Sequence, residues 1–225
     1  MKMPLLLVNC KNYGTHELAS EIALAAKAVV DERAAAGKRE VTIALAVGAT
    51  DIALLKGCGV PVFAEHVDEH KQGSCTGKVL PESVAAVGAA GSLVNHSEDQ
   101  VSEDRIKAMV ARLQEHELVS VVCAKDDVVA ATVAAYGPSF IAMEPPELIG
   151  GDISVSTAQP DLIKKTVSAV KSVSDIPVLV GAGVKNAADV RVGVELGAVG
   201  ILVASGVTKA SDKKAAIAEL ASGFD

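Results

Sequence analysis

Three residues whose side chains can move a proton or stabilise charge stand at the ends of separate apolar runs. They are Lys11, His96 and Glu144, and each follows a short stretch of mostly apolar residues. A carboxylate that leaves a buried strand is partly desolvated, which makes it a stronger general base. A neutral imidazole can donate a hydrogen bond to a carbonyl oxygen, and a lysine ammonium stabilises negative charge that develops there. The three residue types could thus supply a general base, a hydrogen-bond donor to a carbonyl oxygen and a cation for developing negative charge.

Each of these residues also has a purely structural interpretation when it is taken alone. Glu144 could pair with a neighbouring lysine, His96 could be a satisfied structural histidine, and Lys11 could lie along the surface with its ammonium in water. Ser97–Glu98 after His96 is an acceptable helix start, and a helix N-terminus would hold the imidazole neutral. Ser97 is not expected to be a nucleophile, because adjacent residues of an extended segment point to opposite faces.

The elements that must position these residues are short apolar strands alternating with helical stretches. The strands are predicted at Leu5–Asn9, Val41–Ala46, Val60–Glu65, Gly91–Asn95, Leu118–Cys123, Phe140–Met143, Ile176–Val180 and Gly200–Ala204. The helices are predicted at His16–Ala36, Glu103–Glu115, Val128–Ala135, Pro160–Val173, Ala187–Leu196 and Asp212–Ala221. The strands lack apolar/polar alternation, which indicates burial on both faces and a parallel sheet.

A parallel sheet with alternating helices leaves two common architectures, a doubly wound open sheet and a closed (βα)8 barrel. Eight units without a break in composition favour the barrel, as one domain over residues 1–225. Functional residues of such barrels gather at the carboxyl ends of the strands, and phosphate sites lie after the seventh and eighth. The turns with Gly181 and Gly183 and with Ser205 and Gly206 fall there. A dinucleotide fingerprint is rejected, because Asn186 occupies its third glycine position.

Composition excludes several classes of function. The chain has 225 residues and net charge -7, with 21 Lys and Arg against 28 Asp and Glu and no basic stripe, so a nucleic-acid partner is not expected. Its four cysteines stand far apart, as in reduced cytoplasmic proteins. No signal peptide and no membrane-spanning run is expected. The stretch "EHVDEH" (65–70) lacks the H-E-x-x-H spacing of a zinc helix, so we expect no metal.

At these positions the chain resembles the triosephosphate isomerase family, in its short archaeal type. The resemblance runs over nearly the whole length, and the order and spacing of its motifs together are highly specific. The motifs are "VNCKNY" (8–13), "FAEHVD" (63–68), "GSCTGKVLPESV" (73–84), "GSLVNHSE" (91–98), "MEPPELIGGDISVSTAQP" (143–160), "LVGAGVKN" (179–186) and "GILVASGV" (200–207).

The resemblance implies a role for each candidate side chain. Glu144 would be the base that moves a proton between two carbons of dihydroxyacetone phosphate, and neutral His96 would polarise the carbonyl. Lys11 would bind the substrate and stabilise the enediolate, with Asn9 orienting the lysine and Glu98 holding it. These roles are the established ones of such an isomerase.

Other residues would bind the substrate's phosphate. Ile149 and Gly150 lie near the far end of a flap that would close over the phosphate. Gly183, Ala204 and Ser205 would supply backbone N–H groups to it. The resemblance further implies a glycolytic and gluconeogenic TIM-barrel enzyme of the cytoplasm that uses no cofactor and forms a homodimer or homotetramer.

Two other functions stay open at this point. Another phosphate-binding (βα)8 enzyme, such as a lyase or isomerase of aromatic amino-acid biosynthesis, would share the late phosphate turns. A sugar-phosphate-binding protein without turnover would share the pocket. Neither would need Lys11, His96 and Glu144 together. Departures from the family pattern, such as Cys10 and Cys75, concern subunit contacts and stability more than chemistry.

Overall fold

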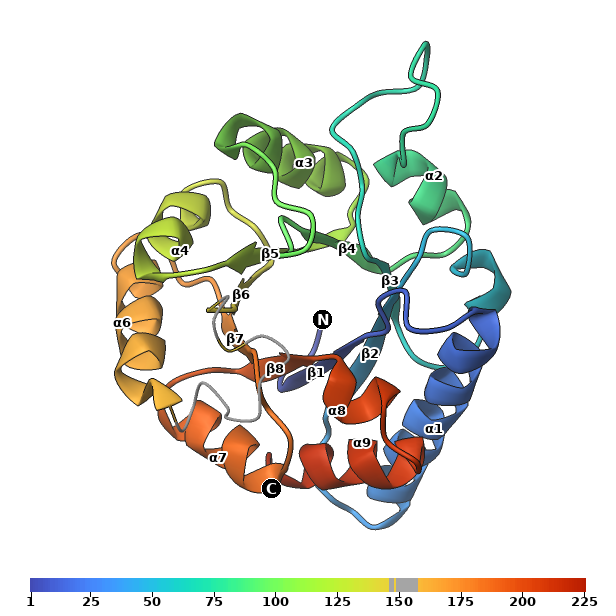
Figure 1. Cartoon of the computed structure of the whole chain (residues 1–225), viewed down its shortest axis with the longest axis vertical. Coiled ribbons are helices and arrows are strands. Elements are labelled where there is room, and N and C mark those ends of the chain that lie inside the picture. Colours follow the sequence, from blue (N-terminus) through green and yellow to red (C-terminus); the bar gives the residue numbers. More distant parts are fainter. Residues whose placement is uncertain (146–147, 149–157) are drawn as a thin grey trace.

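The barrel is closed by eight parallel strands in the computed structural model, which describes residues 1–145, 148 and 158–225. Each strand pairs with the next in sequence, and β8 pairs back with β1. Helices surround this sheet as an outer ring (Figure 1). The fold is therefore the predicted (βα)8 barrel rather than the open doubly wound sheet, and it has no exposed sheet edge.

The bounds of the elements are as follows. The strands are β1 Leu5–Asn9, β2 Thr42–Val47, β3 Val62–Ala64, β4 Gly91–Val94, β5 Val119–Ala124, β6 Phe140–Met143, β7 Val178–Gly181 and β8 Gly200–Val203. The helices are α1 His16–Ala35, η1 Ala53–Leu55, α2 Pro81–Ala86, α3 Glu103–Glu115, α4 Asp127–Ala134, α6 Pro160–Lys171, α7 Ala187–Glu195, α8 Ser205–Thr208 and α9 Lys213–Ser222.

Every predicted strand and helix is present. β1, β6 and α3 have the predicted bounds, and the other predicted elements differ at their ends by one or two residues. The sequence did not predict η1, α2 and α8. Each of these has six residues or fewer. Such a segment is too short for the helical periodicity of apolar residues to be recognised in the sequence.

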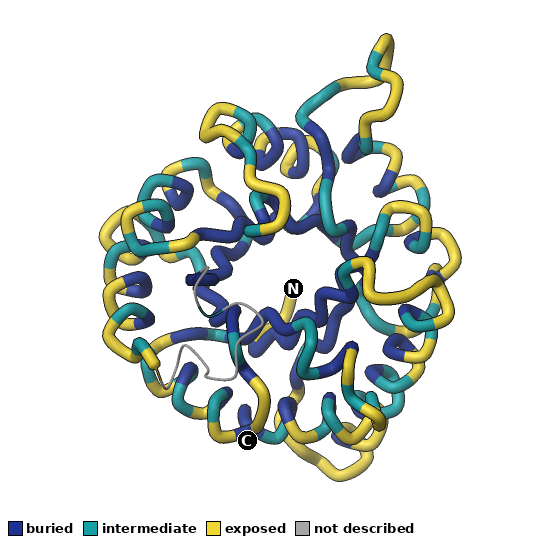
Figure 2. Tube along the Cα trace, viewed as in Figure 1, coloured by how far each residue is buried: buried dark blue, intermediate teal, exposed yellow. Residues whose placement is uncertain are grey.

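Burial on both faces explains why the strand sequences are continuous apolar runs. Alternate residues of β1 face two different cores: Leu5 and Leu7 point into the barrel, whereas Leu6 and Val8 pack against the outer helices. All four are fully buried, and the strands form the dark inner ring in Figure 2. Full burial of one such side chain contributes about 1.5–3 kcal/mol. Packing on both faces of the sheet therefore stabilises the barrel.

The segment between β3 and α2 extends away from the barrel, and many of its residues are exposed (Figures 1 and 2). Among the helices of the described residues, none is both long enough and apolar enough to cross a membrane.

Candidate functional site

The three candidates for proton chemistry meet in one cavity at the carboxyl end of the barrel. Lys11, His96 and Glu144 all line it, together with Asn9. The cavity has a volume of about 50 Å³. These residues follow β1, β4 and β6, which are not all neighbours in the sheet, so only closure of the barrel brings them around one space. We call this space the mouth cavity.

His96 and Glu144 face one another across the mouth cavity. His96 Nε2 lies 3.7 Å from Glu144 Oε2, and each residue is only 7% exposed. The backbone N–H of Glu98 donates to His96 Nδ1 at 3.2 Å. Because Nδ1 accepts this hydrogen bond, the ring proton of the neutral imidazole resides on Nε2. The imidazole therefore presents a donor to the cavity, beside the carboxylate.

The predicted helix start at Ser97–Glu98 is wrong. Residues 96–99 form a turn that the Asp99 N–H closes onto the His96 carbonyl oxygen at 2.8 Å, and α3 begins only at Glu103. Asn95 explains the difference, because its side chain accepts from the Val101 N–H and donates to the carbonyl oxygen of Cys123. These bonds hold the segment as a loop. The Glu98 N–H, rather than a helix terminus, is thus the backbone group that the His96 ring meets.

Hydrogen bonds hold Lys11 both at its backbone N–H and at its side-chain ammonium. Its Nζ donates to Glu98 Oε1 at 2.7 Å, and its backbone N–H donates to Asn9 Oδ1 at 3.0 Å. The lysine side chain is 13% exposed, whereas that of Glu98 is 59% exposed. The ammonium is therefore fixed over the cavity, and its partner carboxylate faces solvent.

Residues with a strained backbone conformation cluster around the mouth cavity. Four non-glycine residues in the described part of the chain have left-handed φ angles, and three of them follow strands at the mouth. These three are Lys11 at +47°, Asn95 at +59° and Ala182 at +80°. Such a conformation costs about 1–2 kcal/mol per residue outside glycine. Strain of this kind persists where the surrounding structure holds a functional geometry.

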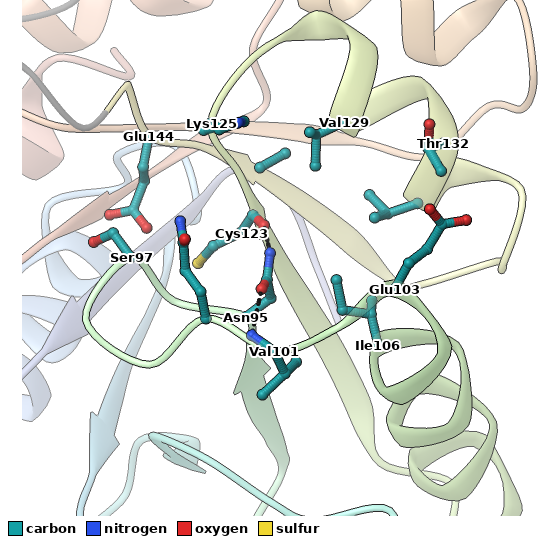
Figure 3. Close-up of a pocket in the computed structure, with 13 residues that line it drawn as sticks. Asn95, Ser97, Val101, Glu103, Ile106, Cys123, Lys125, Val129, Thr132 and Glu144 are labelled. Carbon is teal, nitrogen blue, oxygen red and sulfur yellow. Dashed lines mark hydrogen bonds between the residues drawn. The ribbon is translucent and has the colours of Figure 1, made fainter.

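Glu144 stands between two cavities. A second cavity of about 230 Å³ lies between α3 and α4, and Glu144 and Ser97 form its inner end (Figure 3). Within the described residues, Glu144 Oε2 and Ser97 Oγ have no hydrogen-bond partner. On the opposite side, a Cβ at Gly181 of β7 would lie 2.4 Å from Glu144 Cγ. The glycine therefore leaves the carboxylate the room it occupies.

Cys123 of β5 also borders Glu144. Burial, together with the nearby Glu144 carboxylate, raises the pKa of the Cys123 thiol well above its usual value. The thiol stays protonated and can only donate to the carboxylate. Sequence reasoning gave Cys123 no role, because nothing in its spacing distinguishes it from a core cysteine.

Glu65 is a second group that sequence reasoning left without a role. It follows β3, and burial, with the charges of Asp51 and Glu98, raises its pKa to about 7, against the lowering effect of the nearby backbone N–H and ammonium of Lys11. Its Oε1 is buried without a partner among the described residues. The signal that could have found Glu65 is the one that found Glu144, a carboxylate directly after a buried strand.

The other side of the mouth cavity is built from small residues. Gly183, Ala204 and Ser205 line it after β7 and β8. Gly183 has φ +70°, and the Ala204 carbonyl oxygen accepts from the N–H groups of Val207 and Thr208 as α8 begins. At Gly183, Ala204 and Ser205 the small side chains leave the backbone close to the cavity. The predicted flap residues Ile149 and Gly150 lie outside the described residues.

The stretch 65–70 holds a cluster of potential metal ligands. Ligand atoms of Asp68, Glu69 and His70 lie within 4.8 Å of one another. Arg105 binds both carboxylates, and Lys78 Nζ donates to Asp68 Oδ1 at 3.2 Å. These cations compensate the charge that a metal ion would otherwise balance.

Comparison with known proteins points to one family. The family model described as triosephosphate isomerase matches residues 4–221. The chain is 45% identical to the triosephosphate isomerase of Cenarchaeum symbiosum, over 98% of this chain and 97% of that protein. It is 40% identical to that of Methanoculleus marisnigri, over 99% of each. The crystal structure of triosephosphate isomerase from Bartonella henselae shares the fold, with a TM-score of 0.76, 18% identity and 99% coverage of both chains.

Proposed function

The chain belongs to the triosephosphate isomerase family, and from that premise we propose that it interconverts dihydroxyacetone phosphate and D-glyceraldehyde 3-phosphate. The reaction moves one proton between neighbouring carbons and leaves the overall oxidation level of the substrate unchanged. A base, a hydrogen-bond donor to the oxygens and a cation are sufficient for it. We propose that it proceeds without a metal or a cofactor.

Glu144 is the base in this proposal. Its carboxylate takes a proton from C1 of dihydroxyacetone phosphate, and the electron pair of that bond forms the C1–C2 double bond while the carbonyl oxygen gains negative charge. The protonated carboxyl then returns the proton to C2, where the electron pair of the double bond forms the new C–H bond. The C1 hydroxyl proton passes through His96 to the C2 oxygen, so that C1 becomes the aldehyde and C2 carries the hydroxyl group. Its position beside His96, at 3.7 Å, lets one substrate carbon and one oxygen meet both groups.

His96 and Lys11 stabilise the intermediate. The Nε2–H of His96 donates to the enediolate oxygen and passes protons between the two oxygens, and the Lys11 ammonium offsets the negative charge. Asn9 and Glu98 hold the lysine through its backbone and its ammonium. One donor of this kind contributes about a hundredfold to a thousandfold in rate.

The phosphate occupies the small-residue side of the mouth cavity. Gly183, Ala204 and Ser205 supply backbone N–H groups, which bind phosphate oxygens without the entropy loss of long side chains. Ile149 and Gly150 stay predictions for the flap that covers it. Exclusion of water by such a flap protects an enediolate from losing its phosphate.

The convergence of Lys11, His96 and Glu144 on one cavity carries this proposal. The test is a coupled assay on glyceraldehyde 3-phosphate with the wild type and Glu144→Asp. Shortening the side chain by one methylene draws the base back, and a misplacement of about 1 Å reduces turnover about a hundredfold. Glu103→Asp, whose carboxylate lines only the α3/α4 cavity, should keep full activity. An inactive wild type, or a fully active Glu144→Asp variant, contradicts the assignment.

We also propose the biological setting. The chain acts as one domain over residues 1–225, in glycolysis and gluconeogenesis in the cytoplasm, and its four free cysteines agree with a reducing compartment. A homodimer or homotetramer would cover the exposed segment between β3 and α2. Light scattering gives the assembly, and activity that survives a chelator supports a metal-free reaction.

A further inference from the structure

The charges nearest the reacting atoms do not favour binding of the negatively charged substrate that we propose. Lys11 is paired with Glu98 Oε1 at 2.7 Å, and Glu144 adds a second carboxylate to the mouth cavity. The whole chain carries net charge -7. A phosphate monoester brings a further charge of about -1.5 to -2 at pH 7. A further cation near the phosphate would offset this excess of negative charge.

Two lysines stand on the small-residue side, where the phosphate would lie. Lys185 lines the mouth cavity close to Gly183 in the loop between β7 and α7. Lys209 follows α8, and its Nζ lies 5.0 Å from the centroid of the Tyr13 ring, which lines the same cavity. Both lysines are exposed. We call Lys185 and Lys209 the cationic rim.

Local structure fixes the backbone of both rim lysines. The Lys185 N–H donates to Asp189 Oδ2 at 3.0 Å, and Asp189 in turn donates its N–H to the side chain of Asn186, which caps α7. The Lys209 N–H bonds to the carbonyl oxygen of Ser205 at 3.1 Å, and the Tyr13 ring attracts its ammonium. The start of α7, the end of α8 and an aromatic contact thus hold the rim beside the cavity.

We propose that Lys185 binds the phosphate of the incoming substrate directly and that Lys209 attracts it from behind Tyr13. The cationic rim makes the enzyme select phosphorylated trioses over neutral ones. This inference rests on the proposed function for the identity of the substrate. Charges at the entrance of a cleft raise association rates by about tenfold to a thousandfold, and salt suppresses the effect.

The alternative is that Lys185 only shapes its own loop. A loop-shaping role would alter stability and affect charged and neutral substrates alike. A role in phosphate binding changes KM, leaves kcat nearly unchanged and depends on ionic strength. These readouts separate the two roles.

The test compares Lys185→Gln, Lys209→Gln and the double variant with the wild type. The matched control is Lys107→Gln on α3, because Lys107 also lies over a tyrosine ring, at 5.9 Å from the centroid of Tyr136. At low salt we expect Lys185→Gln to lower kcat/KM for glyceraldehyde 3-phosphate about tenfold, mostly through KM, and Lys209→Gln about threefold. The Ki of inorganic phosphate should rise in parallel, and the salt dependence of kcat/KM should become shallower.

Unphosphorylated glyceraldehyde supplies the second control, through exchange of its C2 proton in D₂O. The rim variants should leave this exchange unchanged, because the substrate carries no charge. An unchanged kcat/KM, or an equal loss with the neutral substrate, overturns the inference. If the wild type does not turn over glyceraldehyde 3-phosphate, the proposed function fails instead. Inorganic phosphate binding, measured by calorimetry on wild type and Lys185→Gln, still tests the rim in that case.

Discussion

On one side of the mouth cavity, after β1, β4 and β6, the groups that face the space are the side chains of Lys11, His96 and Glu144. On the other side, after β7 and β8, glycine and small residues bring the backbone itself to the surface of the cavity. The first side can change bonds, because its groups gain, lose or attract protons. The second side can hold a fixed anion through its backbone N–H groups and the cationic rim, and we assign no proton transfer to it.

We call the first side the chemical side and the second side the phosphate side. The two sides also differ in which substitutions they should tolerate. The chemical side depends on side-chain identity, and three carboxylates lie around Lys11. Glu98 pairs with its ammonium, Glu65 is close enough to be affected by its charge, and Glu144 lines the same cavity. The phosphate side depends on backbone conformation, with Gly183 at φ +70°. Substitutions should therefore affect rate on the first side and substrate affinity on the second.

The largest effect should come from removing the cation on the chemical side. Lys11→Met should lower kcat/KM about a thousandfold, because the enediolate loses its compensating charge. The fold should survive, since the Glu98 carboxylate left behind is 59% exposed and stays solvated. The coupled assay measures the loss, and circular dichroism checks the fold.

Lys2→Met is the matched control for this prediction. Lys2 forms a similar ion pair, with Glu40 at 3.0 Å, but precedes β1 at the opposite end of the barrel. It should keep wild-type kinetics. A loss of less than tenfold in Lys11→Met would show that the chemical side does not depend on this side chain.

The sequence predicted the strands and the residues at their ends better than the contacts between the loops that follow the strands. Apolar runs without alternation are sufficient to predict the strands, and their ends then point to Lys11, His96 and Glu144. The turn at residues 96–99 could not be predicted, because it depends on two hydrogen bonds of the Asn95 side chain. This side chain donates to the carbonyl oxygen of Cys123, which is distant in sequence, and accepts from the N–H of Val101, which follows the turn. The raised pKa of Glu65 was hidden for the same reason, since its causes include charges on other strands' loops.

A middle-sized effect should come from the backbone on the phosphate side. Gly183→Val places a β-branched residue at φ +70°, which costs about 1–2 kcal/mol or shifts the loop. Misplaced N–H groups should raise KM about tenfold while kcat changes little, since about 1.4 kcal/mol corresponds to a factor of ten. Steady-state kinetics on glyceraldehyde 3-phosphate gives both constants.

Gly37→Val separates this loss from simple strain. Gly37 has φ +63°, an added Cβ there meets nothing within 4 Å, and it follows α1 at the end of the barrel away from the mouth. It should lose similar stability and keep its KM. A fall in kcat as large as the rise in KM would erase the distinction between the two sides.

The smallest effect concerns the stability cost of crowding carboxylates on the chemical side. The pKa of Glu65 is about 7 in the folded protein, above its usual value of 4.5. Below pH 4.5 the carboxyl is protonated in both folded and unfolded states and costs nothing. As pH rises towards 7, the unfolded chain ionises first, so Glu65 destabilises the fold increasingly and reaches its full effect above pH 7.

Glu65→Gln should remove this penalty, because the amide stays neutral and has nearly the same shape as the carboxyl group. Since Glu65 is partly solvated, we expect a gain of about 1–2 kcal/mol at pH 8, or roughly 2–6 °C in Tm. The gain should vanish near pH 4.5. Thermal unfolding of both proteins across pH 4.5–8 measures the difference. A gain independent of pH would mean that packing, not ionisation, distinguishes the variant, and that the carboxylates around Lys11 impose no stability cost.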